Sequence, residues 1–169
     1  MPTIITPADF TAELTIAQTE NPYQHNVVQD FIDKYEPKFL RSLLGLELAN
    51  DFVTGLTEDP IQTKWDNLRD NTDLKDMMKN YIYYWYKRNE NTKSMGISEV
   101  KPKAENANAV DGNNKMTRAW NEMVKMNREF DLDVSVYPNW IAPNWFNNYF
   151  WHSRCGVNEI YYPISVLNL

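Results

Sequence analysis

The chain has 169 residues, the usual size of one domain, of which 43% are hydrophobic and 24% charged. Its formal net charge of −6 argues against a protein that binds nucleic acid by neutralising phosphates, because such proteins carry basic patches. One cysteine, Cys155, excludes an intramolecular disulfide and fits a reducing compartment. No apolar run approaches the length of a membrane span, and the first ten residues lack the regions of a signal peptide.

The first twenty residues carry weak structural signals. Thr6 and Pro7 place a cap residue before a proline at the first helical position, which predicts a short helix. Phe10 and Leu14 would be its buried pair. We expect this segment to be only loosely held.

A longer helix is predicted from Asn21-Pro22, where a cap residue again precedes a proline. Asp30 and Lys34 are spaced to form an ion pair on its outer side. Pro37 is expected to end or kink the helix, because proline disfavours the helical conformation of the residue before it. A second helix would follow, with Gly45 at its end or at a kink.

Residues 60–69 predict a short helix, and residues 72–91 carry the strongest helical pattern of the chain, with Thr72 as the predicted N-cap. The apolar stripe of this second helix comprises Leu74, Met77, Met78, Tyr81, Ile82 and Trp85. Tyr83 and Tyr86 fall outside the stripe. The helix therefore either sits centrally or contacts a second molecule.

Residues 91–114 form the longest stretch without periodicity. A run of this length inside a compact domain is usually functional or disordered, so two readings stay open: a mobile solvated loop, or an arm on a neighbouring subunit. Asn113 or Asn114 is predicted to cap the helix that follows. Its buried stripe would comprise Met116, Ala119, Trp120, Met123 and Phe130.

Residues 131–169 contain nine of the 23 aromatic residues of the chain but only four charged residues. A helical core of this size has no obvious room for so many rings, and aromatic residues are enriched at the cores of interfaces. We therefore predict a helical core over residues 1–130 and, in preference to a tail buried on its own chain, an aromatic interaction tail over residues 131–169. The predicted fold is mainly α, a small bundle of about four to five helices with a long loop and a largely non-helical tail.

Few groups in the sequence point to catalysis. His152 and Cys155 are spaced to reach one metal ion, but a zinc site needs three or four ligands. No glycine-rich phosphate loop or hydrolase motif is present. The aromatic run at 81–86 would stack bases only beside a basic groove, which the acidic composition disfavours. We expect no catalytic residue, no metal and no cofactor.

Four motifs, in order, carry a family resemblance: YEPKFLRSLLG at 35–45, KWDNLRD at 64–70, YIYYWYKRN at 81–89 and GISEVKPKAEN at 96–106. Together they resemble the head-to-tail connector proteins of tailed bacteriophages, also called adaptor or head-completion proteins. The resemblance covers about residues 21–130.

The resemblance implies a small helical bundle of which about twelve copies form a closed ring beneath the portal protein. Such a ring would extend the DNA channel and offer a docking platform to the next neck or tail protein. It would perform no chemistry. Double-stranded DNA would pass through the lumen without specific binding, which agrees with the acidic charge of the chain. The protein would belong to the neck of a virion assembled in the host cytoplasm, without a membrane partner.

We predict partner contacts for aromatic residues outside the stripes and for part of the long loop. These candidates are Tyr83, Tyr86, Val100, Lys101, Pro102, Lys103, Tyr137, Trp140, Trp145, Phe150, Trp151, Tyr161 and Tyr162. Two other classes of function remain open. One is a small helical DNA-packaging or regulatory DNA-binding protein, and the other is a small enzyme that uses Cys155 and His152.

Overall fold

The chain folds as a helical bundle over the residues that the computed structural model describes: 3–17, 19–90, 93–95, 98–100, 112–133 and 135–138. The helices in these ranges are α1 (Pro22–Leu44), α2 (Leu46–Gly55), α3 (Thr63–Arg69), α4 (Thr72–Glu90) and α5 (Gly112–Glu129). Two 3-10 turns, η1 (Pro7–Asp9) and η2 (Ala12–Leu14), precede α1. The predicted fold class, a mainly α bundle of about four to five helices, is confirmed.

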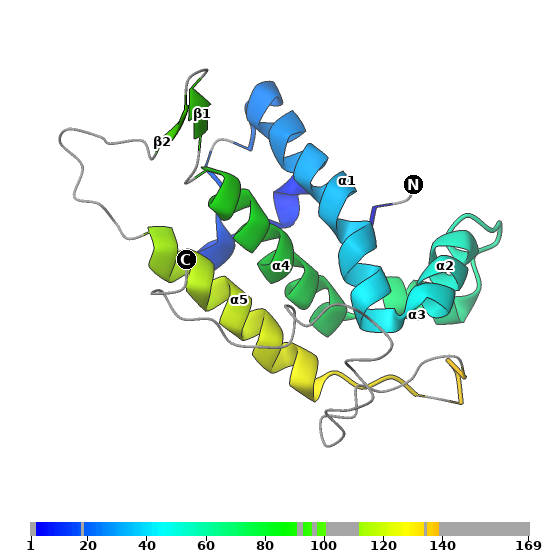
Figure 1. Ribbon diagram of the computed structural model, residues 1–169. Coiled ribbons are helices and arrows are strands. Elements are labelled where there is room, and N and C mark those ends of the chain that lie inside the picture. The colour runs from blue at the N-terminus through cyan, green and yellow to red at the C-terminus, as the bar shows by residue number, and fades with distance from the viewer. Residues whose placement is uncertain are drawn as a thin grey trace.

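Helix α4 is the central helix of the bundle. It lies between α1 and α5, and both of these run antiparallel to it (Figure 1). Its apolar residues are therefore enclosed on more than one side, and Leu74, Met77 and Ile82 are fully buried. The sequence left open whether this helix sits centrally or meets a second molecule, and the central position explains its broad apolar surface.

The cap of α4 is Asn71 and not the predicted Thr72. The Oδ1 atom of Asn71 accepts a hydrogen bond from the backbone N–H of Leu74 at 2.8 Å, which satisfies one donor of the first turn. Thr72 is the first helical residue. Both residue types are good caps, so the sequence pattern fixed this boundary only to within one residue.

The prediction was that Pro37 ends or kinks the helix; the end is not found, because α1 continues through Pro37 to Leu44. Proline removes one backbone hydrogen bond, but Ile32 before it and Phe39 after it are both fully buried and hold the helix on the core. The break comes at Gly45, which closes α1 and opens α2. Its backbone angles, φ 82° and ψ 164°, lie in a region that is open essentially to glycine alone.

The N-terminal segment is held firmly to the bundle, contrary to expectation. Ile5, Phe10 and Ile16 are buried in the core, although Leu14, the expected partner of Phe10, is only partly buried. The backbone N–H groups of Ile4 and Ile5 also donate to the carboxylate of Glu36 on α1, at 3.1 and 3.5 Å respectively. The buried side chains of Ile4, Ile5, Phe10 and Ile16, together with a buried acceptor, thus fix a segment whose sequence pattern was weak.

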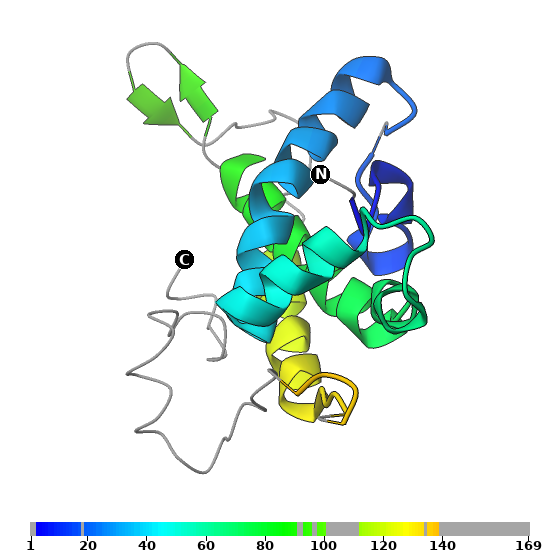
Figure 2. The ribbon, with the colours of Figure 1, turned by 90° about the vertical axis from the view of Figure 1, so that its right-hand side faces the viewer.

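The predicted long loop contains regular structure. Strands β1 (Lys93–Met95) and β2 (Ser98–Val100) pair antiparallel, with Lys93 opposite Val100. Figures 1 and 2 both show this hairpin beyond the end of α4. Helix α5 begins at Gly112, before the predicted caps Asn113 and Asn114. The predicted stripe of α5 is confirmed, since Met116, Ala119, Trp120, Met123 and Phe130 are all buried.

The chain after α5 first packs on its own core. Leu132 and Tyr137 are both buried, so the first residues of the predicted tail belong to the bundle. Residues 139–169, which carry the rest of that tail, lie outside the described residues. Among the described helices none combines the length and the apolar character needed to cross a membrane.

Candidate partner interface

Tyr83 and Tyr86, predicted to contact a partner, are only 1% and 2% exposed, and that prediction is wrong for the folded chain. The Tyr86 ring meets Phe31 edge-on at a centroid distance of 5.6 Å, and its hydroxyl accepts a hydrogen bond from Gln24 Nε2 at 2.7 Å. Burial raises the pKa of the Tyr86 hydroxyl. Both rings fall outside the main stripe because α4 is enclosed on several sides, and not because they face solvent.

Tyr137 is also part of the core and not a free contact residue. Its ring lies 6.1 Å from that of Trp65 on α3, and its hydroxyl donates to the Lys64 carbonyl at 2.6 Å. Burial raises the pKa of Tyr137, so the hydroxyl stays a neutral donor. This residue fastens the chain after α5 to α3.

The other predicted contact residues are not brought together by the described structure. Val100 is the last residue of β2. The remaining candidates lie outside the described residues: Lys101, Pro102, Lys103, Trp140, Trp145, Phe150, Trp151, Tyr161 and Tyr162.

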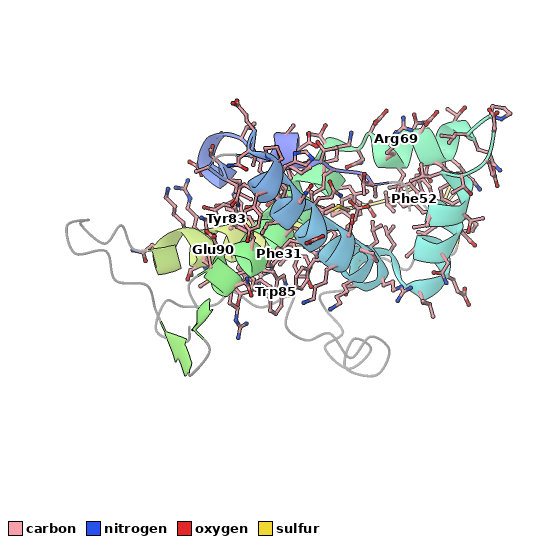
Figure 3. The ribbon with its side chains drawn as sticks, turned by 90° about the horizontal axis from the view of Figure 1, so that it is seen from above. Phe31, Phe52, Arg69, Tyr83, Trp85 and Glu90 are labelled. Carbon is pink, nitrogen blue, oxygen red and sulfur yellow. The ribbon has the colours of Figure 1, made fainter. Side chains whose placement is uncertain are left out.

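The structure instead presents an aromatic ladder on the surface between α1 and α4, formed by Phe31, Tyr35 and Trp85. The three rings are half-buried. Tyr35 stacks on Phe31 at 5.8 Å and on Trp85 at 5.2 Å, with interplanar angles of 17° and 8°. Figure 3 labels Phe31 on α1 and Trp85 on α4, the two rings that stack on Tyr35. A continuous stack of partly exposed rings is a surface of the kind found at the centres of interfaces.

A cationic strip borders the ladder, where Lys34 and Lys38 on α1 and Arg88 on α4 lie over its rings, and Arg41 continues the strip one helical turn beyond Lys38. Lys34 Nζ and Lys38 Nζ lie 5.2 and 5.1 Å from the centroid of Tyr35, and Arg88 Cζ lies 5.2 Å from that of Trp85. These are cation–π distances. All four side chains are exposed.

The strip has no carboxylate partner in the described part of the chain. Lys34, Lys38 and Arg41 form no ion pair there, and the pair predicted between Asp30 and Lys34 is therefore not formed. The sequence did contain a signal for this strip. Positions 34, 38 and 41 are spaced to share one face of a helix, so their cationic side chains follow one another along it.

An acidic lobe occupies α2 and the turn after it, formed by Glu47, Asp51, Glu58 and Asp59. All four side chains are exposed, and residues 42–63 contain no lysine or arginine. None of the four carboxylates forms an ion pair among the described residues. Leu46, beside the lobe, is 61% exposed, which is unusual for a leucine at the start of a helix that otherwise buries its apolar side.

Asn127 is a buried polar residue on the inner face of α5. Its side chain is 0% exposed, and neither amide atom has a hydrogen-bond partner within the described part of the chain. Burial of an unpaired amide costs free energy. We predict that Asn127→Leu raises the free energy of unfolding by roughly 1–2 kcal/mol, as measured by urea titration.

The matched control is Asn67→Leu, at an exposed position of α3, which should change the free energy of unfolding by less than about 0.5 kcal/mol. A loss of stability in Asn127→Leu would contradict this prediction.

The described residues hold no group of three or more histidine, cysteine, aspartate or glutamate side chains placed to bind a metal ion. His25 is exposed at the start of α1. Cys155 and His152, on which an enzymatic reading depended, lie outside the described residues.

Comparison with known proteins returns no relative of this chain. No family model, no curated protein and no solved structure matches it.

Proposed function

We propose that this protein is a structural subunit of a bacteriophage neck, a head-to-tail connector that assembles as a ring below the portal protein. The ring would extend the DNA channel and provide the platform on which the next neck or tail protein docks. In this role the chain works through its surfaces and performs no reaction.

The observation that carries the proposal is the way the resembling motifs meet in space. Tyr35 and Phe39 come from the first motif, and Tyr81 and Trp85 from the third. Their rings pack across the α1–α4 contact, at 5.2 Å between Tyr35 and Trp85 and 5.3 Å between Phe39 and Tyr81. Residues that carry the resemblance thus build the central helix pair of the bundle, so the resemblance concerns the part of the sequence that determines the fold.

The charge distribution supports a role in assembly. The chain carries a net charge of −6, yet it exposes a cationic strip and an acidic lobe that have no ion-pair partners in the described structure. Complementary charge patches steer protein association and set its specificity. An acidic ring also suits a lumen through which DNA slides without binding.

Co-expression with the portal protein encoded in the same genome tests the proposal. We expect the tagged full-length chain to retain the portal protein through size-exclusion chromatography, and to show no retention on a heparin column at moderate salt. Retention of duplex DNA without any portal binding would contradict the proposal and favour the DNA-binding alternative.

A further inference from the structure

We propose that the aromatic ladder and cationic strip of one copy bind the acidic lobe of the next copy. This inference rests on the proposed function and names the two surfaces through which the ring would be built. The occupant is a second copy of this chain.

The first surface lacks acidic and apolar partners. Lys34, Lys38 and Arg41 are exposed and have no carboxylate among the described residues, while the half-buried rings beside them leave apolar area in contact with water. The molecule that covers this face should therefore present several carboxylates next to an apolar side chain.

The second surface has these groups. Glu47 and Asp51 are one helical turn apart on α2, so both can face the same partner, and Glu58 and Asp59 follow in the next turn of chain. Leu46 supplies the apolar side chain at 61% exposure. Within residues 42–63 no basic side chain is present to compete for these carboxylates.

The two surfaces form no ion pair with each other within the described part of one chain, although Arg41 lies in the last turn of α1 and α2 follows directly. Figure 3 shows α2, marked by Phe52, at the end of the molecule away from Phe31 and Trp85. A contact between copies is therefore heterologous: each copy offers its strip to one neighbour and its lobe to the other. Repetition of such a contact gives a closed ring when the rotation between neighbours closes, which is the geometry that a connector needs.

Charge reversal on each surface tests the contact in the full-length chain. The strip variant is Lys34→Glu with Lys38→Glu, and the lobe variant is Glu47→Lys with Asp51→Lys. We expect each variant alone to weaken self-association about tenfold or more in sedimentation experiments at low salt, because like charges then face each other. The matched control, Lys115→Glu with Lys125→Glu, changes two exposed lysines of α5 and should associate like the wild type.

The decisive arm is an equimolar mixture of the strip and lobe variants. When the strip and lobe variants alternate, each contact pairs either two reversed surfaces or two unaltered ones, so the charges are again complementary. Association should therefore return to the wild-type level. Recovery supports the proposal. A strip or lobe variant that associates as tightly as the wild type, or a mixture that shows no recovery, would overturn it.

Two further results separate this inference from the proposed function. If the strip variant still forms the wild-type assembly with the portal protein, the contact is wrong while the connector role stands. If the mixture recovers but the wild type never binds the portal protein, the contact is supported and the connector role fails. If a duplex oligonucleotide binds to the strip and the wild type does not self-associate, the strip binds DNA phosphates and not a second copy, and the inference is overturned.

Discussion

Phe39→Ala is expected to lower the free energy of unfolding by roughly 3–5 kcal/mol. Phe39 is 0% exposed on α1, and its ring lies 5.3 Å from that of Tyr81 on the central helix. Removal of the ring takes away both the transfer free energy of a buried aromatic side chain and its packing against α4, and it leaves a cavity in the core. Urea unfolding followed by tryptophan fluorescence measures the change.

Tyr23→Ala serves as the control for this substitution, because Tyr23 lies on the same helix and is 76% exposed. It should change the free energy of unfolding by less than about 0.5 kcal/mol. If Phe39→Ala does not fold, Phe39→Leu should still unfold cooperatively with a smaller loss, of about 1–2 kcal/mol. Equal effects of the alanine substitutions at Phe39 and Tyr23 would contradict the central place of the α1–α4 contact.

The second large effect concerns Glu36, whose side chain is 1% exposed and accepts the backbone N–H groups of Ile4 and Ile5. Burial raises the pKa of Glu36 from 4.5 to about 7, with a further contribution from the charge of Asp33, although the two N–H groups oppose the shift. No lysine or arginine forms an ion pair with it in the described structure. The carboxylate thus pins the N-terminal segment and is costly to ionise.

The sign of the pH effect follows from this raised pKa. Between pH 4.5 and about 7 the folded chain holds a proton on Glu36 that the unfolded chain has released, so this group's contribution to stability falls as the pH rises. Over that interval the contribution of Glu36 to the free energy of unfolding falls by about 3 kcal/mol, and it is constant at lower and at higher pH.

Glu36→Gln tests this effect because glutamine keeps an acceptor oxygen and cannot ionise. In urea titrations from about pH 4 to pH 8, the free energy of unfolding of the variant minus that of the wild type should increase by about 3 kcal/mol as the pH rises. The exposed control Glu122→Gln, on α5 and outside both proposed surfaces, should show a much smaller change. A difference between Glu36→Gln and wild type that stays constant with pH would show that Glu36 does not titrate in this range.

The helices were predictable because their apolar residues recur at helical spacing. The stripe of α5 is buried as predicted, and so is that of α4 except for the half-buried Trp85. The methionines among them, Met77, Met78, Met116 and Met123, fill the core. Gly45 was recognised as a break, since few residues other than glycine adopt its backbone conformation.

Other features depend on tertiary contacts that no local pattern contains. The stability of α1 through Pro37 depends on burial on both sides of the proline, and the order of the N-terminal segment depends on a carboxylate some thirty residues away in sequence. Partner contacts were predicted for Tyr83, Tyr86 and Tyr137 because a sequence shows which residues are aromatic. It does not show how many sides of a helix are covered by other elements of the same chain. The cationic strip was missed because ion-pair partners were assumed from spacing.

The most direct test of this account is the solution mass of the full-length chain across a range of concentrations at low salt. We predict self-association from the 20.0 kDa single chain towards a closed assembly of about twelve copies, weakened by added salt. A mass of 20.0 kDa at every concentration, unchanged by salt and by the portal protein, would contradict it.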